Sequence, residues 1–173
     1  MNLEILAKVV EDMVLQHDYP GFEPRKLKLG LPDAVKEGPA KVFAEALGHE
    51  NVFVKLAALR WFQESPGKGK GYVKAIAGLL HNQDPWVRVE SIRCLERLLI
   101  SDEEIILTIG RLLSDQDCEV KKAAAKAIGK ICSKGELKPA SVVSQLRAVC
   151  QDADPAVRWK AEKALRLIGQ YDH

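Results

Sequence analysis

Basic side chains at repeating positions are the part of this sequence best suited to chemistry. Arg60, Arg93, Lys126 and Lys163 are separated by 33, 33 and 37 residues. Guanidinium and ammonium groups bind carboxylates and phosphates through charge-assisted hydrogen bonds. Several such groups in one line raise the local concentration of an acidic partner. The pattern therefore predicts the binding of an anionic partner without a covalent step.

Other candidates for catalysis or metal binding are weak. Cys94, Cys118, Cys132 and Cys150 include no C-x-x-C pair, which argues against zinc. We interpret all four as reduced thiols of a cytoplasmic protein. The chain has no glycine-rich phosphate loop and no G-x-S-x-G motif. We therefore expect no cofactor, no metal and no enzymatic activity.

The overall composition is that of an ordinary globular domain, with 47% apolar and 29% charged residues. No apolar run approaches the ~20 residues that span a bilayer, and the N-terminus lacks the pattern of a secretory signal. We therefore expect no membrane association. A length of 173 residues fits one domain.

The elements that must position the basic side chains form an internal repeat. Each repeat has a capping residue, then an anchor valine three residues later, then a small residue and a large apolar residue on the same helix face. Pro85 and Pro155 follow their caps directly, at the first helical position. The caps are Asn51, Asp84, Asp117 and Asp154, and the valines are Val54, Val87, Val120 and Val157.

A second amphipathic pattern precedes each capped helix, so each repeat is predicted to be a pair of helices. We expect an N-terminal capping helix and irregular connector over residues 1–33 and a repeat array over 34–173, with repeats near 34–64, 71–100, 102–133 and 139–170. The predicted helix pairs are 34–47 with 52–63, 71–82 with 85–99, 103–114 with 118–132, and 140–151 with 155–169. A helix over Leu3 to Leu15 should cover the first repeat, residues 17–32 should be irregular, and residues 65–71 should form a flexible basic loop.

The repeat resembles the HEAT repeat, in the short form of the HEAT-like family named after phycobilisome lyases. The stretches that carry the resemblance run from Leu79-Leu80 to Arg88, from Leu112-Leu113 to Lys121, and from Val149-Cys150 to Arg158. The first repeat departs from the pattern, with Gly38-Pro39 inside its first helix. The resemblance implies an all-α fold: an α-solenoid (superhelix) of about four HEAT-like helix pairs plus the N-terminal capping helix.

The resemblance also implies different roles for two rows of basic residues. In HEAT-like proteins the first row, here Lys55, Arg88, Lys121 and Arg158, meets the turn acids of neighbouring repeats, which implies a structural ladder with Asp84, Asp117 and Asp154. The second row, Arg60, Arg93, Lys126 and Lys163, would lie fully solvated along the concave face of the second helices. Some HEAT-like hydroxylases bind iron through repeated His-Glu pairs, but only His49-Glu50 occurs here, so we expect no di-iron site.

The second helices are strongly basic. Across residues 52–63, 86–99, 119–132 and 156–168 there are thirteen Lys or Arg and four Glu, a sum of +9, against +2 for the whole chain. Lys122 and Trp159 join the second row as candidate partner-binding residues. Filling of exposed positions with good helix formers is the competing explanation. We expect a protein-interaction scaffold for an acidic protein or peptide. Binding of nucleic-acid phosphates is the alternative, and a lyase-type or other enzyme-associated role is a minor one.

Overall fold

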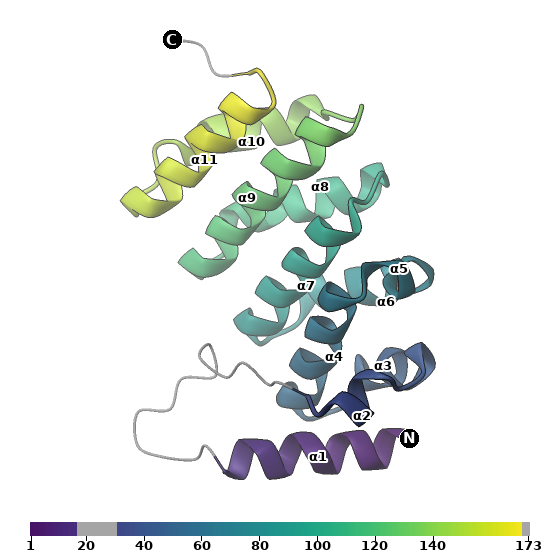
Figure 1. The fold of residues 1–173 in the computed structure, drawn as a ribbon. Coiled ribbons are helices and arrows are strands. Elements are labelled where there is room, and N and C mark those ends of the chain that lie inside the picture. The colour runs from purple at the N-terminus through teal and green to yellow at the C-terminus, as the bar shows by residue number, and fades with distance from the viewer. Residues whose placement is uncertain (17–30, 171–173) are drawn as a thin grey trace.

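The chain folds into stacked pairs of helices that form two layers (Figure 1). The computed structural model describes residues 1–16 and 31–170, and within these ranges all regular structure is helical. The first layer contains α3 (Ala40–Ala46), α6 (Val73–Gly78), α8 (Glu103–Arg111) and α10 (Ala140–Val149), and the second contains α4 (Val52–Glu64), α7 (Pro85–Leu98), α9 (Cys118–Lys134) and α11 (Pro155–Leu167). The all-α solenoid architecture is thus confirmed.

Each second-layer helix begins at the predicted capping residue. The Oδ1 of Asp84 accepts hydrogen bonds from the backbone N–H groups of Trp86 and Val87 at 2.7 and 3.2 Å. Asp117 and Asp154 accept equivalent pairs of bonds, and Asn51 accepts one. These bonds satisfy N–H groups that the first turn of a helix leaves without partners.

A second polar residue supports each cap from two positions upstream. The backbone N–H of the capping residue donates to this residue's side chain at 2.9 to 3.1 Å. In the first repeat the acceptor is the Nδ1 atom of His49, so this histidine has a structural role in its turn. The other three acceptors are Asn82, Asp115 and Asp152.

The core lies between the two layers and between neighbouring second helices. All four anchor valines are buried, as are the small residues one turn further on, Ala58, Ser91, Ala124 and Ala161. Helices α9 and α11 approach closely at Gly129, where an added Cβ atom would lie 2.8 Å from the Cα of Ala164. Small residues at these positions let the second helices stack closely, so the repeats share one continuous core.

Two local predictions were wrong. The first helix of the first repeat is broken into α2 (Asp33–Lys36) and α3, because Gly38 and Pro39 interrupt it. Residues 65–71, predicted as a flexible loop, are almost entirely helical, in α5 (Pro66–Gly69) and the 3-10 helix η2 (Lys70–Tyr72). Gly69 is buried against Leu98, and an added Cβ would lie 2.9 Å from the Cδ2 atom of Leu98. This contact holds the segment on the end of α7.

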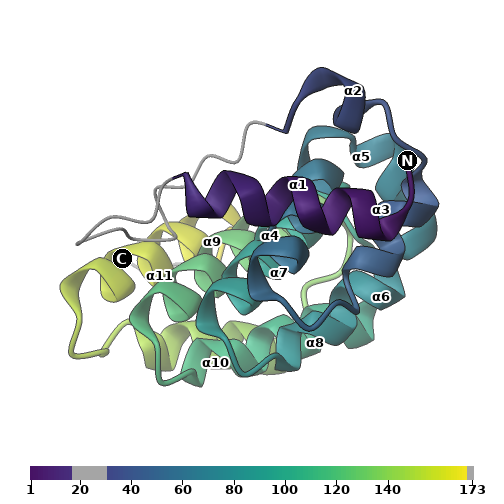
Figure 2. The ribbon, with the colours of Figure 1, turned by 90° about the horizontal axis from the view of Figure 1, so that it is seen from below.

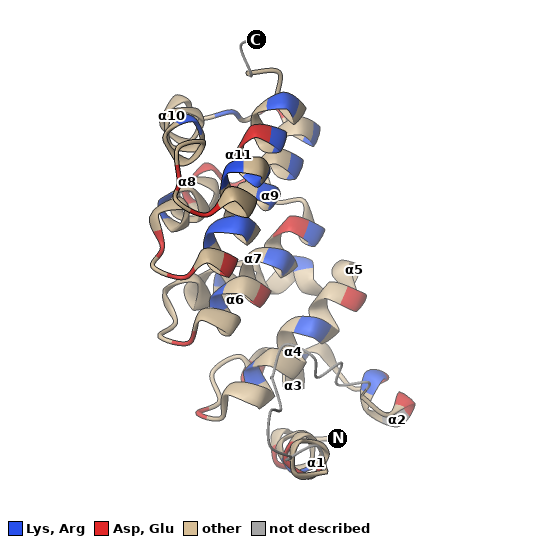
Figure 3. Cartoon of the chain, turned by 90° about the vertical axis from the view of Figure 1, so that its left-hand side faces the viewer, with Lys and Arg blue, Asp and Glu red and all other residues tan. Residues whose placement is uncertain are grey.

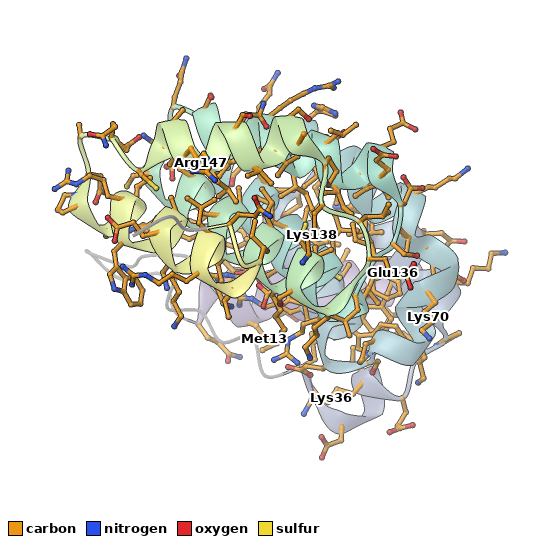
Figure 4. The ribbon with its side chains drawn as sticks, turned by 90° about the horizontal axis from the view of Figure 1, so that it is seen from above. Met13, Lys36, Lys70, Glu136, Lys138 and Arg147 are labelled. Atoms are coloured by element: carbon orange, nitrogen blue, oxygen red, sulfur yellow. The ribbon has the colours of Figure 1, made fainter. Side chains whose placement is uncertain are left out.

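The first helices of the second and third repeats end in short 3-10 turns, η3 (Leu79–His81) and η4 (Leu112–Ser114). At the far end of the array the Nζ of Lys138 donates to the carbonyl oxygen of Ile168 at 3.3 Å. This bond ties the connection between α9 and α10 to the end of α11, and Figure 4 labels Lys138 in this position.

The N-terminal helix α1 (Leu3–Leu15) lies across the end of the array, against α3 and α4 (Figure 2). Leu6 and Val10 bury their side chains in this contact. Trp61 is also buried, and its indole N–H donates to the carbonyl oxygen of Lys36 at 2.8 Å. The predicted connector falls largely outside the described residues, and the division of the chain at residue 33 stays a prediction.

Candidate functional site

Basic side chains gather on the outward side of α4, α7, α9 and α11, which we call the second-helix face. Figure 3 shows Lys and Arg concentrated on α7, α9 and α11, with many of the acidic residues at the turns that join the helices. Within the described residues, no group of three or more His, Cys, Asp or Glu could hold a metal ion. The same part of the chain contains no helix long and apolar enough to cross a membrane.

The second basic row is less solvated than predicted at its N-terminal end. Arg60 is partly buried rather than fully exposed. Arg93 donates to the Oε1 atom of Glu90 at 2.7 Å. The carboxylate of Glu90 is almost fully buried and also accepts a bond from Gln63 at 2.8 Å. Glu90 thus partly neutralises the row at α7, because its carboxylate faces the guanidinium of Arg93.

A second buried carboxylate, Glu96, pairs with two lysines of α9. Its oxygens lie 3.2 Å from the Nζ of Lys126 and 3.0 Å from the Nζ of Lys130. Glu96 is only 4% exposed, so a single desolvated carboxylate holds two ammonium groups. Lys126 is nevertheless about half exposed. It therefore remains available to a partner.

The charge that stays unneutralised surrounds a hollow between α9 and α11. The hollow has a volume of about 340 Å³ and no acidic residue in its lining. Ala164 and Leu167 form its apolar part, and Leu167 is half exposed. The other lining residues are Lys126, Lys130, Ser133, Lys134, Lys160 and Lys163. We call this site the lysine hollow.

The lysines of the hollow influence one another. Desolvation, followed by repulsion from Lys163, Lys126 and Lys122, lowers the pKa of Lys160. Repulsion of this kind favours the arrival of an anion, which stabilises every ammonium group around it. The electrostatic repulsion among these lysines therefore favours the binding of a negatively charged ligand at this site.

Trp159 stands beside the hollow with half of its surface exposed. The Nζ atoms of Lys160 and Lys163 lie 4.7 and 5.1 Å from the centre of its ring, within the range of cation–π attraction. Lys122 donates a hydrogen bond to the carboxylate of Glu119 at 2.7 Å, and this bond raises the pKa of Lys122. A neighbouring hollow brings Lys122, Trp159 and Lys160 together with Arg93.

The structure thus brings five of the six predicted partner-binding residues to two adjoining hollows and leaves one apart. Lys122, Lys126, Trp159 and Lys163 lie on α9 and α11 around the adjoining hollows. Arg93 on α7 lines the neighbouring hollow, as Lys122 and Trp159 do, whereas Arg60 on α4 lines neither hollow. Lys130, Lys134 and Lys160 were missed, because a search for basic residues repeated in register passes over positions that are basic in only some repeats.

Two of the four basic residues of the predicted ladder pair with an acid of the next repeat, but the acids are not the predicted ones. Arg88 donates to both carboxylate oxygens of Asp115 at 2.9 and 2.8 Å, and Lys121 donates to Asp152 at 2.5 Å. The predicted acids cap helices instead, because a carboxylate oxygen of each accepts hydrogen bonds from backbone N–H groups at a helix N-terminus. They are Asp84, Asp117 and Asp154. Arg158 donates to the carbonyl oxygens of Asp152 and Ala153 at 2.8 and 3.0 Å. In the turn before α7, the residue at the position of Asp115 is Asn82, an amide that carries no charge to pair with Lys55.

The cysteines are free thiols. Cys94 and Cys132 are buried. Burial, with a smaller contribution from Glu90, raises the pKa of Cys94 to about 12. A thiol with such a pKa is not a nucleophile at neutral pH.

Comparisons with known proteins agree with this architecture. The HEAT repeats family matches residues 72–139 and 111–172, together more than half of the chain. No curated protein matches the chain significantly in sequence.

Similar solved structures include an engineered protein, with 22% identity, a TM-score of 0.61, and coverage of 96% of this chain and 79% of that one. Human deoxyhypusine hydroxylase in complex with glycerol has 20% identity and a TM-score of 0.62 over 98% of this chain and 62% of its own. The CpcE–CpcF complex of phycocyanin lyase from Nostoc has 14% identity and a TM-score of 0.53, and the match covers 88% of this chain and 71% of that one.

These likenesses are too low in identity to extend beyond the fold. The repeated helix pairs, their capping aspartates and the match over residues 72–172 agree on one family. The chain belongs to the HEAT repeat family.

Proposed function

We propose that this protein is a non-catalytic interaction scaffold that binds an acidic segment of a partner protein on its second-helix face. The observation that carries the proposal is the lysine hollow, where five lysines line one cavity and no acid does. We place the protein in the cytoplasm, where its four free thiols would stay reduced.

The surroundings of the hollow support a protein partner. Most of its lining residues are charged, but Ala164 and Leu167 form an apolar part that can contact the carbon atoms of a partner side chain. Trp159 is exposed beside it. Exposed tryptophans beside charged groups are typical anchors of protein interfaces. An acidic segment with apolar residues interspersed would meet both kinds of surface.

Nucleic acid is the second candidate, and Trp159 is the observation that favours it. An aromatic ring flanked by lysines suits base stacking next to a phosphate backbone. The two candidates differ in their dependence on salt, because binding through many phosphates weakens steeply as salt rises.

Fluorescence anisotropy with a labelled acidic peptide, a DNA duplex and a DNA single strand separates the candidates, at about 50 and about 200 mM salt. We expect the peptide to bind and the variant Lys134→Glu/Lys163→Glu to lose that binding. Both residues are exposed, and neither forms the buried pair that Lys126 makes with Glu96. Lys41→Glu/Lys74→Glu, two exposed lysines of the first layer, is the matched control.

The outcomes are distinct. DNA binding that is tighter than peptide binding and steeply salt-dependent would move nucleic acid to first place. Equal losses in the two charge-reversal variants would show that only overall charge matters, and would remove the hollow as the site. An absence of binding to all three probes at the lower salt concentration would refute the proposal.

A further inference from the structure

The positive charge of the second-helix face is concentrated rather than spread in a line. Arg93, in the middle of the row, is held by the buried carboxylate of Glu90. Around the lysine hollow, five ammonium groups meet one carboxylate, that of Glu96, so five minus one leaves four positive charges. The feature to explain is therefore a compact cationic cavity at the C-terminal end of the array.

The individual lysines have few means to relieve this charge within the chain. The contacts of Lys160 and Lys163 with the ring of Trp159 remove no charge. Lys134 stands in the last turn of α9, where the helix dipole favours a cation but does not neutralise it. Desolvation and the neighbouring lysines already lower the pKa of Lys160. A ligand with several negative charges at one point would stabilise all of these groups together.

We propose that the lysine hollow binds phosphoryl groups on phosphorylated side chains of the acidic protein segment. This inference rests on the proposed function and specifies the chemistry that the site recognises. A phosphorylated serine or threonine carries about −1.5 to −2 charges and three strong acceptor oxygens on one atom. Two such groups match the four positive charges of the hollow, whereas carboxylates would need four separate side chains to converge there.

The distribution of the positive charge over the surface favours a phosphorylated protein segment over a nucleic-acid backbone. A nucleic acid presents phosphates at regular intervals and is held best by a continuous basic track. Here the track is interrupted at Glu90 and Glu96, and the free charge lies around one cavity of about 340 Å³. The apolar part of the cavity, at Leu167, suits the carbon atoms of a side chain that carries the phosphoryl group.

The test uses one short labelled acidic peptide in three forms: two adjacent serines both phosphorylated, both replaced by glutamate, or unmodified. Affinity is measured by anisotropy for the full chain at about 150 mM salt. We expect the phosphorylated form to bind at least about tenfold more tightly than the glutamate form. In Lys160→Gln/Lys163→Gln this preference should shrink to about twofold or less. It should persist in the control Lys41→Gln/Lys74→Gln.

Each other result overturns the inference in a recognisable way. Equal affinities of the phosphorylated and glutamate forms would remove the phosphoryl preference and leave the scaffold proposal standing. Failure of every form to bind, also when the salt is lowered to about 50 mM, would refute both proposals. Displacement of the phosphorylated peptide by duplex DNA at equal phosphate concentration would assign the hollow to nucleic acid instead.

Discussion

The guanidinium of Arg88 and the carboxylate of Asp115 form two parallel hydrogen bonds, at 2.9 and 2.8 Å, although they are 27 residues apart. Both side chains are mostly buried, 15% and 8% exposed. Asp115 also accepts the backbone N–H of Asp117 at 2.9 Å. One carboxylate therefore joins helix α7 of the second repeat to the turn of the third.

We expect Asp115→Ala to destabilise the fold by about 3 kcal/mol, because the largely buried guanidinium of Arg88 loses its counter-charge and keeps only the carbonyl oxygens of Asn82 and Gln83 as acceptors. Urea unfolding followed by circular dichroism measures this change. Glu45→Ala, which removes the carboxylate of the exposed pair with Lys41, is the control and should cost less than about 0.5 kcal/mol. Similar effects of the two substitutions would show that the buried ladder adds nothing beyond an ordinary surface pair.

We expect the carboxylate of Glu96 to stabilise the fold but to weaken the binding of an anionic partner. Glu96→Gln keeps the shape of the side chain but leaves Lys126 and Lys130 without a counter-charge. We expect a loss of about 1–3 kcal/mol in stability. Binding of the doubly phosphorylated peptide should strengthen, because the hollow gains one net positive charge. Thermal melts and anisotropy on the same sample measure both effects, and weaker binding by the folded variant would contradict the electrostatic account.

Gly129 should be needed for the close stacking of α9 and α11. In Gly129→Ala the new methyl group would meet the backbone of Ala164 at 2.8 Å, so the helices must separate, at a cost of about 1–3 kcal/mol. Gly78→Ala is the matched control, because no atom lies within 4 Å of its added Cβ and alanine favours the helix. Urea unfolding should show a loss for the first variant and no loss for the second.

Leu99 adopts a left-handed conformation, with φ at 49°, at the end of α7, and about half of its side chain is exposed. This backbone region costs a non-glycine residue about 1–2 kcal/mol. We expect Leu99→Gly to leave stability unchanged or to raise it by up to about 1 kcal/mol, because relief of strain offsets the lost contacts. A clear fall in the urea midpoint would show that the leucine contacts outweigh the strain.

Acid should weaken both the ladder at Asp152 and the helix cap at Asp154. The hydrogen bond from Lys121, together with the N–H of Asp154, lowers the pKa of Asp152. The N–H of Ala156 does the same for Asp154. Because the folded pKa values are the lower ones, this stabilisation is present above the unfolded pKa of about 4 and is lost as pH falls through the folded values. Thermal melts between about pH 7 and pH 3 should show the fall, and Asp152→Asn should make it shallower.

Much of the fold could be predicted from local signals. The capping residues at Asn51, Asp84, Asp117 and Asp154 determine where the second helices begin, because each supplies an acceptor to the first turn. The anchor valines mark the buried face. The helical turns within residues 65–71 were missed because the glycines and lysines there are typical of loops, while the burial of Gly69 against Leu98 is a tertiary contact.

The sequence by itself determined the helix pairs, the buried stripe and the basic sign of the second helices, since these depend on short spacings within one repeat. Only the tertiary structure decided that Arg88 binds Asp115, that Glu90 and Glu96 are buried against the basic row, and that Lys134 and Lys160 join Lys126 and Lys163 around one hollow. The physical reason is that contacts between repeats depend on the rotation and separation of successive helices. Side-chain volumes at close contacts such as Gly129 and Ala164 set that geometry, and it appears in no single repeat.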